Sequence, residues 1–377
     1  MIPFNRAYIS GNELDEIAKA LAMRTLQGDG YYTKQCHDWF IEKLSCDSAF
    51  LTSSCTLALD MASVVAGFGP GDEVLVPDFT FVSTAQCVAL RGATPVLCDI
   101  RPDTLNLDER RLEEAITDKT RGIIPIHYAG ISAEMETICK IADKHGLTVI
   151  EDAAQAVGSK FHGKPVGTYG AMSAFSFHGT KNIQCGEGGL LAVNSPDLTD
   201  ACAVAWEKGT DRRQFLEGNL ERYQWKSLGS SFLTSEISAA MLWSQLNIEE
   251  EITRKRCEIW ERYHSAFADA EQKGLVTRPT VPEGVEHNGH LYYLILPDTE
   301  TRARMIRAMT EVGVGTVFHY TPLHESDGGK KYCRTGMSLT HASSLPHRLI
   351  RLPLFPDLSD SEQAHVIASI LEFLETL

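Results

Sequence analysis

The sequence predicts an α/β fold in which a mostly parallel sheet lies between layers of helices. Two observations predict it. Short apolar runs typical of strands alternate along the chain with segments whose apolar residues recur at helical spacing, an order that produces parallel strands joined by helices. The chain also has 377 residues, 43% of them hydrophobic, which is long enough for one large core and a smaller lobe. We therefore expect a large domain over residues 1–245 and a smaller α+β domain over residues 246–377.

The first helix is expected within residues 11–27, where Leu14, Ile17 and Leu21 share a face and Gly28-Asp29-Gly30 ends the pattern. The elements predicted after it are a helix at Leu57–Val65, a strand at Glu73–Val76, a helix at Ser83–Leu90, a strand at Thr94–Cys98, a helix at Asp108–Ile116 with Asp108 as its N-cap, a strand at Gly122–Ile126, a helix at Glu134–His145 and a strand at Leu147–Ile150.

The second half of the chain opens with a long helical pattern. Residues from about Thr234 to Ala268 contain neither Gly nor Pro, and we expect one helix there that bridges the two domains. The elements predicted after it are a loop marked by Pro279, Pro282 and Gly284, a strand at Tyr292–Leu296, a helix at Thr301–Val312, a strand at Gly315–His319, an irregular loop at Glu325–Ser344 and a helix at about Ser361–Thr376.

Composition excludes several classes of function. The formal net charge of −15 and the lack of a clustered basic face argue against nucleic acid as a partner. The ten cysteines contain no C-x-x-C pair, so we expect reduced thiols and no zinc or other metal site. The first residues show no leader pattern and no apolar run reaches about 18 residues, so we expect a cytoplasmic protein with no membrane partner.

The most informative residues are a lysine and a carboxylate. Asp152 follows the apolar run Leu147–Ile150, and Lys181 comes 29 residues later in the string Ser176–Asn182. Side chains at the carboxyl ends of parallel strands gather at a ligand site. A lysine that forms a Schiff base, together with a carboxylate that keeps a pyridine nitrogen protonated, is what pyridoxal 5'-phosphate (PLP) chemistry requires. These residues therefore predict a PLP site, with Lys181 as its catalytic residue.

Other strings supply the remaining parts of such a site. Thr52–Thr56 places small hydroxyl residues before a helix, an arrangement that binds anions but also serves as a plain N-cap. Phe81 follows a strand and could stack on a flat cofactor or simply fill the core. Gln155, about one turn after Asp152, could reach a ring oxygen, and Ser176 could hold a phosphate. Each feature alone is weak evidence for a PLP site, but all of them together, in this order along the chain, are stronger evidence.

Together these strings resemble the DegT/DnrJ/EryC1/StrS sugar-nucleotide aminotransferases over the whole chain. The resemblance is carried by Pro3-Phe4, Gly28–Gly30, Thr52–Thr56, Pro77–Phe81, Pro125–Gly130, Glu151–Gln155, Ser176–Asn182, Gly186–Gly189 and Phe318–His324. It implies the aspartate-aminotransferase fold, which is fold type I of the PLP enzymes. It also implies L-glutamate as amino donor, a dTDP-linked 4-keto sugar as acceptor, and a homodimer with active sites at the subunit interface.

The resemblance also implies roles for individual residues. The residues implied to bind PLP are Cys55, Thr56, Phe81, Asp152, Gln155, Ser176, Lys181 and Ser231. The pyrophosphate of a sugar nucleotide must also be matched despite the net charge of −15, and the candidates for binding this substrate are Tyr31, Lys208, Arg212, His290, His319, Tyr320 and His324. A lone histidine is more often structural, so both roles stay open for each histidine. Ser230-Ser231 departs from the family pattern, because many members carry Tyr-Asn there and use the Asn to reach the cofactor phosphate of the neighbouring subunit.

Several alternatives stay open or are disfavoured. Amination to the gluco epimer, amination at C3, and use of a UDP or GDP sugar stay open. Some related proteins carry histidine in place of the lysine and catalyse dehydration, and the presence of Lys181 disfavours that reaction. A non-catalytic scaffold protein is disfavoured because the lysine, the carboxylate and the phosphate site are all present. Gly158–Lys164 has the spacing of a phosphate loop, but Pro165 replaces the magnesium-binding hydroxyl. No G-x-G-x-x-G opens a helix, which disfavours a dinucleotide reductase.

Overall fold

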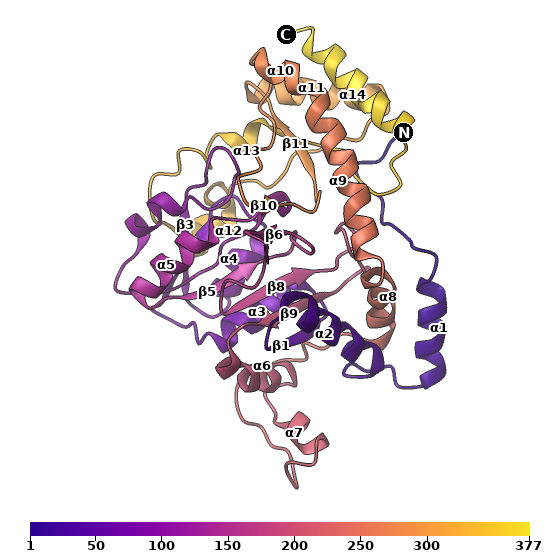
Figure 1. Ribbon diagram of the computed structural model, residues 1–377. Coiled ribbons are helices and arrows are strands. Elements are labelled where there is room, and N and C mark those ends of the chain that lie inside the picture. The colour runs from indigo at the N-terminus through magenta and orange to yellow at the C-terminus, as the bar shows by residue number, and fades with distance from the viewer.

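The computed structural model describes residues 1–377 and contains a large sheet of eight strands (Figure 1). The spatial order is β1-β9-β8-β5-β4-β2-β3-β12. The strands are β1 (Ser48–Thr52), β2 (Glu73–Pro77), β3 (Thr94–Cys98), β4 (Thr120–Ile123), β5 (Thr148–Asp152), β8 (Met172–Ser176), β9 (Gly189–Val193) and β12 (Arg334–Thr335). Only the two pairs that involve β9 are antiparallel. The mostly parallel sheet predicted from the sequence is confirmed.

Helices cover both faces of this sheet. The helices of this part of the chain are α1 (Glu13–Met23), α2 (Tyr31–Leu44), α3 (Cys55–Val65), α4 (Val82–Ala89), α5 (Met135–His145), α6 (Thr199–Trp206) and α8 (Glu236–Leu246), with the short 3₁₀ helices η1 (Glu109–Ala115), η2 (Tyr128–Gly130) and η3 (Pro196–Leu198). The short helix α7 (Arg212–Leu216) projects away from the sheet (Figure 1). One core contains residues of α3, α4 and α6 and the other contains residues of α2, α5 and α8. Val74 and Val76 of β2 belong to the first core and Leu75 to the second, as alternation along a strand requires.

A third hydrophobic cluster lies in the C-terminal part of the chain. It is built by α9 (Glu249–Ala266), α10 (Ala268–Gln272), α11 (Thr299–Glu311) and α14 (Asp360–Leu374) around the two-stranded sheet of β11 (Tyr292–Ile295) and β13 (Leu349–Leu352). Figure 1 shows α9 rising from α8, beside the large sheet, toward this cluster. Ile2 also packs here, so the first residues of the chain join the C-terminal cluster before the chain reaches α1. The division at residue 245 stays a prediction.

Short elements complete the chain. They are β6 (Lys160–Phe161), β7 (Lys164–Pro165), β10 (Val285–Glu286), η4 (Leu323–Glu325), α12 (Asp327–Tyr332) and α13 (Leu345–Arg348). The segment Gly158–Lys164, whose spacing matches a phosphate loop, forms most of the β6–β7 hairpin and opens no helix. This geometry agrees with the argument against a nucleotide-dependent enzyme. None of the helices has the length and apolar character needed to cross a membrane.

The structure corrects two of the predicted helices. Glu109–Ala115 is a 3₁₀ helix capped by Asp108, a tighter form that short runs commonly take. The single helix expected at 234–268 is divided, because α8 ends at Leu246 and Ile248 has φ −125° and ψ 21°. Asn247 favours conformations outside the helix, and three glutamates at Glu249–Glu251 favour a new helix N-terminus.

Two predictions in the C-terminal region are also wrong. The strand expected at Gly315–His319 forms only an isolated bridge from Val317 to Arg351, and Val317–His319 line a cavity. The loop expected at Glu325–Ser344 contains α12, whose N-cap Ser326 accepts a hydrogen bond from the Gly329 N–H. It also contains β12, which pairs with β3 at the edge of the large sheet.

Candidate active site

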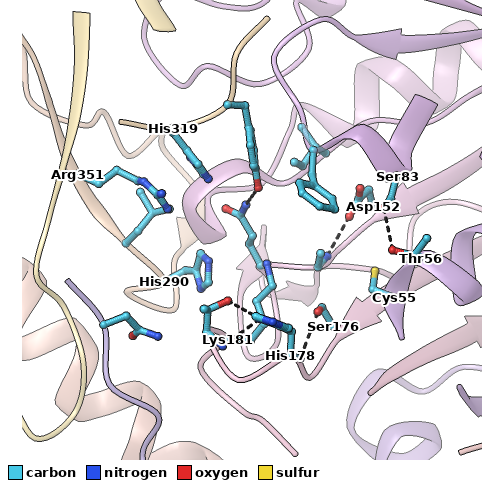
Figure 2. Close-up of a pocket in the computed structure, with 18 of the residues that line it drawn as sticks. Cys55, Thr56, Ser83, Asp152, Ser176, His178, Lys181, His290, His319 and Arg351 are labelled. Atoms are coloured by element: carbon cyan, nitrogen blue, oxygen red, sulfur yellow. Dashed lines mark hydrogen bonds between the residues drawn. The ribbon is translucent and has the colours of Figure 1, made fainter. Parts of the chain in front are cut away.

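A cavity of about 780 Å³ lies where β5 and β8 end, between the large sheet and segments of the C-terminal region. Ligands of parallel sheets bind at this edge. Figure 2 shows two groups of side chains in the cavity. Cys55, Thr56, Ser83 and Asp152 lie on one side, Arg351, His319 and His290 on the other, and Lys181 lies between them.

The N-terminus of α3 forms an anion cradle. Ser54 caps the helix by accepting a hydrogen bond from the Leu57 N–H at 3.2 Å. The N–H groups of Cys55 and Thr56 in the first turn have no partner within the helix and carry the positive end of its dipole. The hydroxyls of Thr56 and Ser83 lie 2.7 Å apart beside them. A Cβ at Gly189 would lie 2.3 Å from the Cys55 nitrogen, so only glycine lets β9 run this close to the cradle.

Asp152 is a buried carboxylate without a cationic partner among the protein's side chains. It is the last residue of β5 and is 3% exposed. Its Oδ2 accepts from the Thr84 hydroxyl at 2.7 Å and its Oδ1 from the Ala154 N–H at 3.2 Å. Burial raises the pKa of Asp152, and the hydrogen bond from Thr84 opposes this rise. Such a carboxylate is suited to a ligand that brings a positive charge or a proton.

Lys181 lies on a loop that the backbone holds in place. Its N–H donates to the His178 carbonyl at 2.8 Å, and the Gly179 N–H donates to the Gly186 carbonyl at 2.8 Å. Burial lowers the pKa of Lys181, whereas Cys55 and Asp152 nearby act to raise it. A lowered pKa enlarges the unprotonated, nucleophilic fraction of the amine at neutral pH.

Aromatic and amide groups also line the cavity. Phe81 is 53% exposed, and its ring lies 5.9 Å from that of Tyr320. The Gln155 side chain accepts from the Ala129 N–H at 2.7 Å and donates to the Tyr320 hydroxyl at 3.0 Å. Ser176 accepts weakly from the His178 N–H, at 3.4 Å. A flat ligand could stack on Phe81 with Asp152 and Gln155 at its edge.

The opposite side of the cavity is rich in nitrogen donors. Burial lowers the pKa values of His290 and His319 well below the usual histidine range, so both rings are neutral at pH 7. The Asn182 amide donates to the Asn288 carbonyl, which directs its oxygen toward His290 Nδ1 at 2.8 Å. His319 Nδ1 lies 2.6 Å from the Tyr128 hydroxyl. Arg256 and Arg351 complete this side.

The cavity brings most of the predicted site residues together. Those that line it are Cys55, Thr56, Phe81, Asp152, Gln155, Ser176, Lys181, His290, His319 and Tyr320. Tyr31, Lys208, Arg212 and Ser231 do not line it. Tyr31 is the first residue of α2 and is 53% exposed. Lys208 and Arg212 both form ion pairs with Glu207. Ser231 forms an isolated antiparallel β-bridge with the backbone of the same glutamate. The binding roles expected of them stay predictions.

His324 also does not line the cavity, because its side chain and backbone contact Asp78 instead. Its Nδ1 is 2.6 Å from Asp78 Oδ2, and its backbone N–H donates to Asp78 Oδ1 at 2.8 Å. Asp78 is fully buried. The pair therefore fastens the segment that carries His319 and Tyr320 to the segment that carries Phe81.

Sequence reasoning missed several residues of the site, among them Ser83, Thr84 and Arg351. Ser83 and Thr84 are hydroxyl residues at the start of α4, so the rule that selected Thr52–Thr56 would have found them. Arg351 stands in the apolar run Leu349–Leu352, and a charge inside a buried strand is itself a signal.

Comparison with known proteins decides the family. The family model described as the DegT/DnrJ/EryC1/StrS aminotransferase family matches residues 7–371. The chain belongs to this family. SpsC of Bacillus subtilis, a spore coat polysaccharide biosynthesis protein, is 33% identical over 99% of this chain and 97% of its own length.

Two solved structures of similar proteins support the family assignment. The aminotransferase TlmJ from Streptoalloteichus hindustanus has a TM-score of 0.91 at 29% identity and covers 100% of this chain and 99% of its own. The PLP form of Spr1654 from Streptococcus pneumoniae, a protein assigned as a sugar aminotransferase, has a TM-score of 0.90 at 26% identity and covers 100% and 99%. These similarities confirm the fold expected from the sequence, that of fold type I PLP enzymes.

This member of the DegT/DnrJ/EryC1/StrS family is a PLP-dependent sugar aminotransferase. The residues of the cavity fit the cofactor. The cradle at α3 suits its phosphate, the unpaired Asp152 suits its ring nitrogen, and the buried Lys181 suits its aldehyde.

Proposed function

We propose that the protein transfers an amino group from L-glutamate to C4 of dTDP-4-dehydro-6-deoxy-D-glucose, giving dTDP-4-amino-4,6-dideoxy-D-galactose and 2-oxoglutarate. The observation that carries the transamination is one cavity in which Lys181 lies between Asp152 and a side rich in arginine and histidine. The residues of the first side would hold the cofactor, and the second side would remain for two anionic substrates that bind in turn. Ping-pong kinetics follow from this sharing.

The choice of sugar rests on four strings. Glu207–Arg212, Tyr223–Trp225, Leu228–Phe232 and Asn288–Tyr292 resemble the dTDP-4-amino-4,6-dideoxygalactose transaminases of enterobacterial common antigen synthesis. We therefore assign the product to surface-polysaccharide synthesis of this type, in the cytoplasm. The name of SpsC, a polysaccharide biosynthesis protein, agrees with this class of pathway. The gluco epimer, amination at C3 and UDP or GDP sugars are the alternatives.

We assign a different chemical role to each of three residues of the cavity. PLP, when bound, withdraws electrons from the reacting carbon and carries the amino group from one substrate to the other. Asp152 would hold the proton on the ring nitrogen, and Gln155 would contact the ring oxygen. Lys181 Nζ would hold the cofactor in the resting enzyme, and its amine would be the base that accepts the Cα proton of glutamate. Its lowered pKa favours this role as a base.

We also propose a homodimer whose active sites lie at the subunit interface. The segment around α7 projects from the rest of the chain (Figure 1) and carries exposed apolar side chains, among them Trp225 at 76% and Leu228 at 56%. Exposed apolar groups of this size favour a protein interface. Light scattering tests the assembly: a mass of twice the 41.6 kDa chain supports it, and a monomer contradicts it.

The decisive experiment is a product assay. Protein is incubated with PLP, L-glutamate and dTDP-4-dehydro-6-deoxyglucose, and the product is analysed by mass spectrometry and NMR. We expect a 4-amino galacto sugar that disappears in Lys181→Ala and persists in Lys140→Ala, a change at an exposed position of α5. A gluco product would keep the reaction and change the pathway. No product from protein that still binds PLP through Lys181 would contradict the choice of sugar, and UDP and GDP sugars would be tested next.

A further inference from the structure

Two buried side chains close to the cavity, His127 and Glu151, take no part in the proposed chemistry. Both are 0% exposed, and neither lines the cavity. His127 Nε2 lies 3.0 Å from Glu151 Oε2. Glu151 directly precedes Asp152 in β5, and successive side chains of a strand point to opposite faces of the sheet. The pair therefore lies one residue from the Asp152 carboxylate, on the other face of the strand.

Glu151 accepts as many hydrogen bonds as a carboxylate can. Its Oε1 accepts from the N–H groups of Tyr169 and Gly170, each at 2.7 Å. Its Oε2 accepts from the Gly167 N–H at 2.9 Å and also faces His127. An ionised carboxylate offers about four lone-pair sites, and each of them is used here. Any change that removes one donor therefore leaves part of a buried charge unsatisfied, which is costly.

The contacts of the His127 ring determine which of its nitrogens carries the proton. Its Nδ1 accepts a hydrogen bond from the Ala133 N–H at 3.2 Å. A ring nitrogen that accepts carries no proton, so the proton lies on Nε2, which donates it to Glu151. The ring thus ties Ala133 to the buried carboxylate and closes the turn that runs from residue 127 to residue 133.

The backbone of this turn reaches two residues of the cavity. The His127 N–H donates to the Asp152 carbonyl at 3.2 Å, and the Asp152 N–H donates to the Pro125 carbonyl at 2.8 Å. The Ala129 N–H donates to the Gln155 side chain at 2.7 Å. Ala129 has φ 62°, a left-handed conformation that costs energy for any residue except glycine. Such a conformation persists only where the surroundings hold it, and the closed turn supplies that constraint.

We propose that His127 and Glu151 are positioning residues of the aminotransferase reaction, because the pair holds the backbone that directs Asp152 and Gln155 toward the cofactor ring. The inference rests on the proposed function, which assigns Asp152 to the ring nitrogen and Gln155 to the ring oxygen. His127 and Glu151 do not line the cavity and act only through these two residues. A displacement of about 1 Å can cost on the order of 100-fold in rate, so a pair outside the cavity can still control turnover.

The ring nitrogen of the bound cofactor gives the first test. In protein loaded with PLP that is isotopically labelled at this nitrogen, its NMR resonance reports whether it holds a proton. His127→Leu removes the donor to Glu151 and the acceptor for Ala133. We expect the resonance to move toward that of the unprotonated ring and kcat to fall on the order of 100-fold, because Asp152 is displaced. Glu151→Gln should do the same, and His127→Gln, which keeps a group that can donate to Glu151, should recover part of both.

Amide hydrogen exchange of the full chain, with and without PLP, gives a readout that does not depend on activity. The turn at residues 127–133 should exchange faster in His127→Leu than in wild type, because the ring no longer closes it. Asp99→Asn is the control matched to Glu151→Gln. Asp99 is also 0% exposed, accepts from the N–H groups of His341 and Ala342 at 3.1 and 2.8 Å, and does not line the cavity. Its substitution should lower stability to urea and leave the turn, the resonance and kcat unchanged.

Two results would overturn the proposal. If His127→Leu and Glu151→Gln lose stability but keep the exchange of the turn, the resonance and kcat of wild type, the pair only supports the fold. A fall in kcat with an unchanged resonance would mean that the effect does not pass through Asp152. If far-UV circular dichroism shows that His127→Leu does not fold, His127→Asn is measured in its place, because it keeps an acceptor for Ala133 and loses the donor to Glu151.

Failure of the proposed function looks different from failure of this inference. If wild type aminates no dTDP sugar, the choice of sugar fails, and the resonance and the exchange still test the pair. If Asp152→Asn leaves the resonance unchanged, the role assigned to Asp152 fails. If Asp152→Asn moves the resonance and His127→Leu does not, the inference fails alone.

Discussion

The Thr84 hydroxyl donates a 2.7 Å hydrogen bond to Asp152 Oδ2, joining the first turn of α4 to the end of β5 across 68 residues of sequence. Thr84 is itself 2.7 Å from the Thr80 hydroxyl, so the contact belongs to a short buried chain. Since Asp152 has no cationic side chain as partner, this hydroxyl is its principal source of stabilisation as an anion. The carboxylate that we propose as the partner of the ring nitrogen thus depends on a residue that does not line the cavity.

Thr84→Val should therefore narrow the pH range of activity. The hydrogen bond lowers the pKa of Asp152 against the effect of burial, so its loss raises that pKa and leaves Asp152 protonated at higher pH. The acid limb of the kcat/KM profile should move to higher pH, so that at the acid end the variant is about 10-fold less active than wild type, the value of one hydrogen bond to a charged group. Thr310→Val, on the exposed side of α11, should leave the profile unchanged. A uniform loss at all pH values would contradict this explanation.

Asp152→Asn should keep the shape of the site and remove its charge. An amide cannot hold a proton on the ring nitrogen, so the electron withdrawal that the reaction needs is lost. Removal of one preorganised electrostatic group typically costs 100- to 1000-fold, and we expect roughly that fall in kcat for the overall reaction. Steady-state kinetics with saturating PLP measure it, with Asp118→Asn at an exposed position as control. Near-normal turnover would exclude Asp152 as the partner of the ring nitrogen.

His324→Ala tests a structural role against the binding role expected from sequence. The substitution leaves the buried Asp78 carboxylate without the imidazole at 2.6 Å, and the free energy of unfolding should fall by about 2 kcal/mol. In Asp78→Asn/His324→Ala the buried charge is absent, so part of the loss should return. Urea denaturation measures both. Unchanged stability together with a raised KM for the sugar nucleotide would favour the binding role.

His37 should make stability depend on pH. It is buried, its Nε2 accepts from the Leu51 N–H at 2.8 Å, and burial lowers its pKa from 6.5 to about 3. Below pH 6.5 His37 is protonated in the unfolded chain, whereas in the folded protein it stays neutral down to about pH 3. The free energy of unfolding therefore falls as the pH falls through this window. At pH 5 the loss is about 2 kcal/mol.

His37→Gln keeps a hydrogen-bond acceptor and removes the titration. Between pH 7.5 and pH 5 wild type should lose about 2 kcal/mol more than this variant, as measured by urea unfolding at both pH values. His365→Gln, at an exposed position on α14, should behave as wild type. Equal losses in wild type and His37→Gln would show that other groups carry the acid sensitivity.

The parts of the fold and site that sequence predicts are those governed by local rules. Asp152 was found because a polar residue after an apolar strand lies at the ligand edge of a parallel sheet, and β3 matched its predicted bounds because alternation is a local pattern. The Thr84–Asp152 and Asp78–His324 contacts join residues 68 and 246 positions apart, and no periodicity encodes such pairs. The break between α8 and α9 was missed because it uses neither Gly nor Pro.

The position of β12 has a consequence for the order in which the chain can fold. Arg334 and Thr335 cover the outer edge of β3, and Arg334 also forms an ion pair with Glu73 of β2. During synthesis the other seven strands of the large sheet emerge first, and the edge of β3 stays bare until nearly the whole 377-residue chain has been made. An unpaired edge invites association with other chains. Nascent or truncated chains that stop before residue 334 would therefore be the species most in need of a chaperone.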